Sequence, residues 1–430
     1  MTNALRIGLA GLGTVGGGVA RLLLQNAGPL GARAGKPLAL TAVSARDRKK
    51  KRRTGLNGAV WEDDALALAR RPDVDVVVEL IGGENGVAAT LVEESLKNRK
   101  HVVTANKALL ARQGAALARL AEGHNVSLKF EAAIAGGVPI VKALRESLIA
   151  YDVTAVRGIL NGTCNFILTE MERTGRPFPD MLAEAQKQGF AEADPALDVG
   201  GVDTAHKLAL LAALAFGTMP DLAAVTVKGI ESICPDDIAF AREFHCRIKL
   251  LGVARRGGHG IEQRVYPAMV RMGTPLADVE GSFNAVVADM GEAGQFVFEG
   301  RGAGEGPTAS AVIADLVDVA RGSTGPTFGR PAAELVKLVA APPDAHTSAY
   351  YMRFSVLDVP GVMAEISHKL AHEGISIESM IQRGRAPGEP VSIVMITHKT
   401  AEGTLRRALK AIAASDKVFE RPSMIPMEAV

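Results

Sequence analysis

Short, almost uninterrupted apolar runs alternate with stretches of helical period in the first third of the chain. The apolar runs lie at 6–11, 38–45, 74–82 and 101–106. Runs of this kind are typical of parallel strands, which are buried on both faces, and helices must then form the crossovers between them. The pattern predicts a Rossmann-type, doubly wound α/β domain over residues 1–130.

The pattern changes from residue 131 onward. A strongly apolar helical run reaches residue 216, and short alternating runs follow at 264–272, 283–290 and 294–300. These runs indicate an antiparallel sheet. We therefore expect an α+β domain over 131–320, and its last helix, after the glycine-rich turn near residue 304, is expected to return to the first domain.

The last quarter of the chain separates into a spacer and a small module. Residues 321–348 are rich in Gly, Pro, Ser and Thr and show little period, so they read as a linker between two cores. Residues 349–430 give the order β, α, β, β, α, with a last strand at 418–424. That order predicts a ferredoxin-like βαββαβ module.

Composition narrows the class of protein. The net charge is only +2, which leaves no basic excess for binding nucleic acid. The longest uncharged apolar run, 208–216, is far too short to span a membrane. The three cysteines lie far apart without disulfide or metal spacing, and the first strand follows the N-terminus almost directly, without a secretory signal. We expect a cytoplasmic protein without nucleic-acid or membrane partners.

A glycine-rich turn leads from the first predicted strand into the first predicted helix. Gly11, Gly13 and Gly16 have the GxGxxG spacing. In a dinucleotide site these glycines permit the tight turn, the approach of backbone to the pyrophosphate and the close packing of the helix. The helix N-terminus, with Thr14 and Val15, supplies N–H donors to the anion. This strand–turn–helix context favours a dinucleotide site over a structural turn.

The end of the second predicted strand bears on the type of dinucleotide. Arg46 comes first there, followed by Asp47 and a basic run over 48–53. An NAD site places an acidic residue at this strand end, whereas an NADP site places an arginine near the 2′-phosphate. A solvated charged loop accounts for most of the basic run, but Arg46 favours NADP over NAD.

Thr104 and Lys107 lie at the carboxyl end of the apolar run at 101–106. Ligands of open α/β sheets bind at that edge. Lys107 could be an ordinary surface lysine that begins a helix, but a cation is unfavourable at a helix N-terminus. An anionic or carbonyl-bearing ligand would offset this cost, so both residues are candidate ligand contacts.

The apolar helix that ends near residue 216 keeps two charged residues on one edge. Asp203 and Lys207 are spaced as an i,i+4 pair, which normally lies on a solvated face. The rest of this helix has almost no polar face, and a buried lysine is costly unless it is paired. A buried ion pair is therefore a catalytic candidate. His206 beside it is more typical of a core or supporting residue.

Glu131 precedes a tight glycine-rich turn. The carboxylate and the carbonyls of such a turn could hold a cation. Composition alone favours a purely conformational turn.

At this point the residues match a known family. The chain resembles homoserine dehydrogenase over essentially its whole length, in the bacterial form with a C-terminal ACT domain. The matching stretches include "GLGTVG", "VTANKALLA", "NGTCNFILTEM", "AEADPALDVGGVDTAHKLALLA", "GRGAGEGPTASAVIADL" and "DVPGVMAEI". The fourth stretch is the most specific, because it fixes five ionisable positions at set spacing.

The resemblance implies the NAD(P)H-dependent interconversion of L-aspartate 4-semialdehyde and L-homoserine, on the route to threonine, methionine and isoleucine. Lys207 would be the acid/base and Lys107 would contact cofactor and substrate. The resemblance adds Asp198 and Asp203 as pocket residues, Glu192 for the substrate amino group and Gly304 for the nicotinamide. A sodium ion would be held by Glu131 and the carbonyls of Ile134, Gly136 and Val138.

Assembly and regulation also follow from the resemblance. The family has a homodimeric catalytic core, and pairing of ACT strand edges between subunits would extend this to a homodimer or homotetramer. Asp358, Pro360 and Gly361 turn the chain before a helix N-terminus suited to a carboxylate. We expect feedback inhibition by a pathway amino acid, with threonine the first candidate, and a module used only for oligomerisation is the alternative.

Two other functions stay open on the sequence. One is another NAD(P)-dependent amino-acid or sugar oxidoreductase, which a substrate screen would identify. The other is a sensor that binds a dinucleotide and an amino acid without chemistry. A sensor leaves the cost of the buried Asp203 and Lys207 unexplained.

Overall fold

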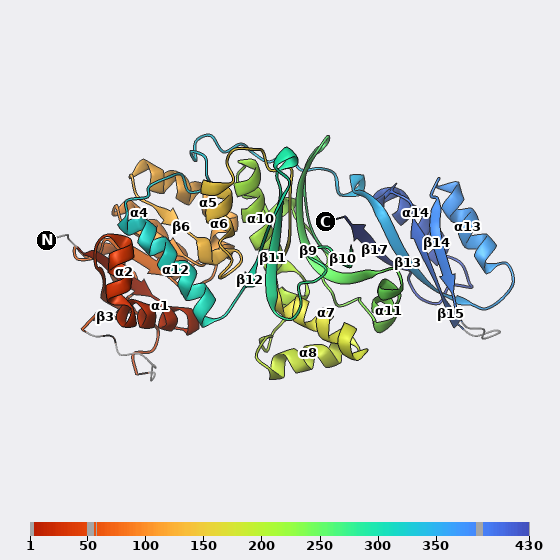
Figure 1. Ribbon diagram of the computed structural model, residues 1–430, viewed down its shortest axis with the longest axis horizontal. Coiled ribbons are helices and arrows are strands. Elements are labelled where there is room, and N and C mark those ends of the chain that lie inside the picture. Colours follow the sequence, from red (N-terminus) through yellow and green to blue (C-terminus); the bar gives the residue numbers. More distant parts are fainter. Residues whose placement is uncertain (1–3, 50–55, 57, 384–389, 430) are drawn as a thin grey trace.

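The computed structural model describes residues 4–49, 56, 58–383 and 390–429. Three parts follow one another along the long axis of the molecule (Figure 1). Within the described residues, no helix has both the length and the apolar character that a membrane span requires.

The N-terminal part is built on a six-stranded parallel sheet with the order β3-β2-β1-β4-β5-β6. The strands are β1 (Leu5–Ala10), β2 (Leu38–Ser44), β3 (Val60–Glu62), β4 (Val76–Glu79), β5 (His101–Thr104) and β6 (Leu128–Lys129). The helices are α1 (Thr14–Gln25), α2 (Ala27–Ala34), α3 (Ala67–Arg70), α4 (Val87–Lys97) and α5 (Lys107–Gly123). The strand order reverses direction at β1 and β4, the point where doubly wound sheets bind ligands. The predicted Rossmann-type fold is confirmed.

One helix of this part comes from far along the chain. Helix α12 (Glu305–Ala320) packs against α1, and its buried residues Ala309, Val312 and Leu316 share a core with β1. A Cβ added at Gly18 of α1 would lie 2.7 Å from Cγ of Glu305, so the two helices are in close contact. The C-terminal end of the second part therefore packs against the N-terminal part.

The central part packs helices against one face of a large sheet. Its strands β7 (Ala155–Ile159), β9 (Cys246–Gly257), β10 (Gly260–Arg271), β11 (Phe283–Asp289) and β12 (Gln295–Arg301) pair antiparallel, and β8 (Thr226–Val227) joins β10. The helices are α6 (Ile140–Lys142), α7 (Gly162–Thr174), α8 (Phe178–Lys187), α9 (Ala196–Val199), α10 (Val202–Phe216) and α11 (Pro235–Glu243). The expected antiparallel sheet is confirmed.

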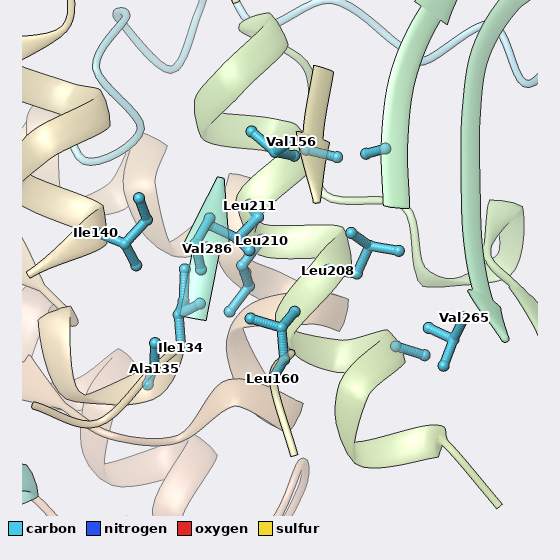
Figure 2. Packing of buried hydrophobic residues seen from close by; sticks show 14 of the residues in the cluster. Ile134, Ala135, Ile140, Val156, Leu160, Leu208, Leu210, Leu211, Val265 and Val286 are labelled. Carbon is cyan, nitrogen blue, oxygen red and sulfur yellow. The ribbon is translucent and has the colours of Figure 1, made fainter. Parts of the chain in front are cut away.

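Helix α10 is the central element of this core. Leu208, Leu210 and Leu211 point in different directions from it and are each almost fully buried. Figure 2 shows them packed among side chains such as Leu160, Val286 and Ile134 from the surrounding elements. The ionisable side chains of this helix, Asp203, His206 and Lys207, all lie in its first two turns, and the apolar residues that follow are packed in the core.

The C-terminal part has the predicted ferredoxin-like order. It contains β13 (Thr347–Leu357), α13 (Val362–His372), β14 (Ile377–Gln382), β15 (Pro390–Thr397), β16 (Thr400–Ala401), α14 (Glu402–Ala413) and β17 (Ser423–Glu428). The last strand was wrongly placed at 418–424. It begins at Ser423 because its buried half, around Ile425, pairs with strands on both sides, which local composition does not reveal.

The two C-terminal parts share one sheet. Strand β17 pairs antiparallel with β13 and parallel with β10, so the path β12-β11-β7-β9-β10-β17-β13-β15-β14 is continuous. The segment before β13 is also packed, since Phe328 and Leu338 are buried in the central core. The C-terminal part keeps a core cluster of its own, which includes Tyr350 and Ile412, but the segment expected as a linker is packed and the sheet is shared. Strand pairing across such a sequence distance leaves no trace in composition.

Candidate active site

Three charged side chains meet where the carboxyl edge of the parallel sheet faces the start of α10. Lys107 is the first residue of α5, and Asp203 and Lys207 lie one turn apart on α10. The Asp203 carboxylate accepts both lysines: Oδ1 lies 3.1 Å from Nζ of Lys107, and Oδ2 lies 2.8 Å from Nζ of Lys207. The cation at the start of α5, unfavourable by itself, thus has a buried anion opposite it.

Lys207 is enclosed by the protein. Its side chain and that of Asp203 are each 12% exposed, which excludes an ordinary solvated i,i+4 pair. Nζ also donates to the carbonyl oxygen of Leu160 at 2.6 Å. An ammonium has three donors, so two described acceptors fix its position and one donor is left for a ligand.

The two aspartates of the site titrate in opposite directions. Burial alone would raise the pKa of Asp203, but the charges of Lys207 and Lys107 and hydrogen bonds from Lys207 and Asn161 hold it well below its usual range. Burial raises the pKa of Asp198, and the neighbouring Asp203 adds to this, against the lowering effect of a hydrogen bond from Asn161. The surroundings of Asp203 therefore favour its carboxylate form, whereas those of Asp198 favour protonation.

Sequence reasoning missed Asn161 and the carbonyl of Leu160. Asn161 is the N-cap of α7, and its Nδ2 donates to Oδ1 of Asp198 at 2.7 Å and to Oδ2 of Asp203 at 3.0 Å. An asparagine directly before a helical pattern is a recognised cap signal. The contacts with the two aspartates could not be predicted from the sequence around Asn161, because both partners lie far along the chain.

Other predicted site residues lie differently. The side chain of Glu192 is exposed in the loop between α8 and α9, and no described contact joins it to the lysine cluster. The hydroxyl of Thr104 is fully buried and donates to Oε2 of Glu79 at 2.6 Å, so its cofactor contact stays a prediction. His206 is half-buried beside the cluster, where burial and then Lys107 lower its pKa.

The glycine-rich turn has the geometry of a pyrophosphate cradle. A Cβ at Gly16 would lie 1.8 Å from the carbonyl oxygen of Gly11, so the turn and α1 approach as only glycine permits. A Cβ at Gly13 would meet nothing within 4 Å, which leaves that side open. Helix α1 begins with Thr14 and Val15, without a capping side chain or an acidic residue in its first turn. Its first N–H groups are thus suited to an anion.

The remaining cofactor candidates flank this cradle. Arg46 is exposed just beyond the end of β2, and part of the basic run after it, 50–53, lies outside the described residues. Gly304 is the N-cap of α12. A Cβ at neighbouring Gly302 would overlap the side chain of Asn284, whose Nδ2 donates to the same Leu160 carbonyl that accepts Lys207. The loop before α12 therefore contacts Asn284, which shares the Leu160 carbonyl with Lys207.

The candidate cation site is a buried acidic turn. Both carboxylate oxygens of Glu131 accept backbone N–H groups, from Val141 and Lys142, at the start of α6. Burial raises the pKa of Glu131, and it raises that of Asp315, whose carboxylate accepts the N–H of Glu131, to about 7. Oδ1 of Asp315 is buried without a described partner. Two buried carboxyl groups with an unpaired oxygen fit a cation, although no cluster of three His, Cys, Asp or Glu occurs among the described residues.

The sequence matches known protein families and their members. Residues 139–317 match the homoserine dehydrogenase family, 11–131 its NAD-binding domain and 350–416 the ACT domain. Homoserine dehydrogenase of Neisseria gonorrhoeae is 44% identical over 99% of both chains.

Solved structures of homoserine dehydrogenases superpose on this chain. A homoserine dehydrogenase structure from Thiobacillus denitrificans superposes with a TM-score of 0.93 at 40% identity, covering 99% of this chain and 98% of that one. A hyperthermophilic archaeal homoserine dehydrogenase in complex with NADPH superposes with a TM-score of 0.62 at 25% identity, covering 74% of this chain and 97% of the other.

Proposed function

The chain belongs to the homoserine dehydrogenase family, and from this premise we propose how its own residues carry out the reaction. It is an NAD(P)-dependent oxidoreductase that interconverts L-homoserine and L-aspartate 4-semialdehyde, within the biosynthesis of threonine, methionine and isoleucine. The observation that carries the proposal is the buried cluster in which Asp203 holds both Lys107 and Lys207.

Lys207 is the proton donor to the substrate oxygen. The nicotinamide, when bound, exchanges a hydride with the substrate carbon that bears this oxygen. Reduction of the aldehyde leaves an alkoxide, and the remaining donor of the Lys207 ammonium supplies the proton. In the oxidative direction the neutral amine takes the hydroxyl proton. Lys107, on the other side of Asp203, stabilises the negative charge that develops on the oxygen.

The amino-acid part of the substrate is bound by carboxylates. Asp198 and Glu192 are available to the α-ammonium group through charge-assisted hydrogen bonds. Glu192 is exposed in the α8–α9 loop, so closure of that loop over the substrate would bring it into contact.

NADP is the favoured cofactor, with NAD as the alternative. Arg46, exposed beyond the end of β2, would contact a 2′-phosphate, and the hyperthermophilic archaeal relative was solved in complex with NADPH. Gly11, Gly13, Gly16 and the first turn of α1 would hold the pyrophosphate, and Thr104 and Gly304 would border the nicotinamide.

A sodium ion is proposed at the turn that begins with Glu131. Its carboxylate and the carbonyls of Ile134, Gly136 and Val138 would bind the ion. The unpaired Oδ1 of buried Asp315 supports a compensating positive charge near this turn.

Regulation through the ACT domain completes the proposal. The domain would bind a pathway amino acid, threonine first, near the N-terminus of α13, where Gly361 with φ of 91° turns the chain. Homodimers or homotetramers in the cytoplasm are proposed, in keeping with three free cysteines.

A spectrophotometric assay tests the proposal. NADPH absorbance is followed with purified full-length protein and either aspartate semialdehyde or aldehydes of other amino acids and sugars. We expect oxidation with aspartate semialdehyde in strong preference to the others. Dinucleotide binding without turnover would favour the sensor, and preference for another aldehyde would favour a different oxidoreductase. Millimolar threonine is then added, and the absence of inhibition would leave oligomerisation as the role of the ACT domain.

A further inference from the structure

Asn161 lies at the junction of β7 and α7, and both the oxygen and the nitrogen of its side-chain amide form hydrogen bonds. The residue is 5% exposed, and its Oδ1 accepts the backbone N–H of Cys164 at 2.8 Å, which caps α7. Because the cap uses the carbonyl oxygen of the amide, the orientation of the group is set. Its NH₂ must face the opposite side.

On that opposite side lie two carboxylates from different helices. Nδ2 donates to Asp198 of α9 and to Asp203 of α10, so both of its hydrogens are used. The same Oδ2 of Asp203 also accepts Lys207. Asn161 is thus a neutral donor between two anions that would otherwise repel each other, and it is in direct contact with the anion that fixes the lysine.

Capping alone does not require asparagine. Serine, threonine and aspartate cap helices about as well, but none of them also presents an NH₂ group. Asparagine combines an acceptor for the cap with two donors for the carboxylates. The identity of the residue therefore points to the carboxylates and not to the helix.

We propose that Asn161 is a positioning residue for proton transfer, which holds Asp198 ionised beside Asp203 and keeps Lys207 aligned with the substrate oxygen. This inference rests on the proposed function of Lys207. Burial and Asp203 raise the pKa of Asp198, whereas the Asn161 hydrogen bond and the charges of Lys207 and Lys107 lower it. Removing the donor therefore raises the pKa of Asp198 further.

The test exchanges the amide while the cap is kept. Asn161→Ser retains a capping oxygen but has no NH₂. Asn165→Ser is the matched control, because Asn165 is a buried amide one turn along α7 that bonds Val279, Phe283 and Lys249 and no active-site carboxylate among the described contacts. kcat and both KM values are measured across pH, with thermal unfolding as the measure of folding.

We expect Asn161→Ser to lower kcat about tenfold to a hundredfold, the effect of losing a hydrogen bond to a charged group. The decrease in kcat should be greatest at acidic pH, because the acidic limb of the kcat profile moves to higher pH. The KM for NADPH should not change. Asn165→Ser should lower stability without moving that limb.

Asn161→Asp, which keeps the shape and the cap but adds a third carboxylate, should lose at least as much activity and serves if the serine variant fails to fold. The proposal is overturned if a folded Asn161 variant keeps the wild-type kcat and acidic limb, or if Asn165→Ser moves the limb equally. An inactive wild-type enzyme, or a fully active Lys207 variant, would instead refute the proposed function.

Discussion

Asp203 is the central charge of the site, because its one carboxylate forms ion pairs with two ammonium groups. Its own ionisation is secured by Lys207 and Lys107, which outweigh the effect of burial on its pKa. The anion in turn offsets the cost of keeping two lysines at a partly buried site. The offset matters most for Lys207, whose side chain is 12% exposed, against 36% for Lys107.

Replacement of Lys207 by methionine tests the proton donor. We expect turnover to fall by roughly two to four powers of ten, the usual contribution of general acid–base catalysis. Affinity for NADPH should change little. The control is Lys249→Met, since Lys249 is also buried, bonded to Asn165 and Val279, but lies outside the cluster. Near wild-type turnover in the Lys207 variant would remove this residue from the acid/base role.

Arg46→Ala tests cofactor selection. A charge-assisted hydrogen bond to a 2′-phosphate is worth about 1.5–3 kcal/mol, so NADPH should bind about tenfold to a hundredfold more weakly, with little effect on NADH. Arg48→Ala is the control, because Arg48 lies on the same loop with its guanidinium 5.9 Å from the ring centroid of Trp61. Equal losses for the two cofactors would show that Arg46 is only a loop residue.

At the scale of elements, the start of α10 determines where Asp203 and Lys207 lie. Gly201, the N-cap, has φ of 86°, and a Cβ there would lie 3.0 Å from Val265 of β10 and 3.1 Å from Val227 of β8. The left-handed conformation and the close neighbours both require glycine. The turn that carries Asp203 is therefore packed directly against the sheet.

Gly201→Ala should displace this turn. The left-handed backbone alone costs about 1–2 kcal/mol with a side chain present, and the contact with Val265 should shift the turn and lower kcat. Gly175→Ala offers a matched control, since Gly175 has φ of 69° at the end of α7 but nothing within 4 Å of an added Cβ. We expect both variants to lose stability in thermal unfolding and only the first to lose activity. Equal activity in the two would contradict the role of Gly201.

At the scale of the whole molecule, buried charges join the ACT domain to the catalytic sheet. Arg264 of β10 bonds Glu402 at the start of α14, and Asp237 of α11 accepts Arg353 of β13 at 2.8 Å. Arg264 is followed in the strand by Val265, which borders Gly201. Contacts therefore run without a break from Glu402 through Arg264 and Val265 to Gly201, next to the turn that carries Asp203.

Glu262 at this junction gives a pH-dependent prediction. Burial would raise its pKa, but His346 and Arg255 outweigh burial and lower it to about 2. Because the pKa of Glu262 is lower in the folded than in the unfolded protein, its ionised form stabilises the fold at pH values above the unfolded-state pKa. This stabilisation is lost as the pH falls through about 2. Glu262→Gln should lower the free energy of unfolding by at most about 3 kcal/mol at neutral pH. The difference from wild type should shrink below about pH 4.5.

Chemical denaturation at several pH values measures this difference. Glu420→Gln is the control, because Glu420 faces Arg353 at 4.0 Å with its side chain 69% exposed, where screening leaves little effect. A pH-independent difference for Glu262→Gln would show that its charge does not stabilise the junction.

The sequence by itself determined what depends on local chemistry. The period of the apolar positions predicted the Rossmann-type sheet, the antiparallel strands and the ferredoxin-like module, because burial on one or two faces imposes a repeat on the chain. The GxGxxG turn and the charged edge of α10 could be identified in the sequence. Glycine and a buried ion pair each cost stability, so their presence indicates a structural or functional requirement.

Only the tertiary structure decided how distant segments meet. Asn161 joins Asp198 to Asp203, Asp203 reaches across to Lys107 of another domain, and β17 pairs with β10 more than a hundred residues away. These contacts depend on side-chain direction and strand register after folding. Each partner taken alone has an ordinary local role as a cap, a helix start or a strand, so no local pattern marks the pairing.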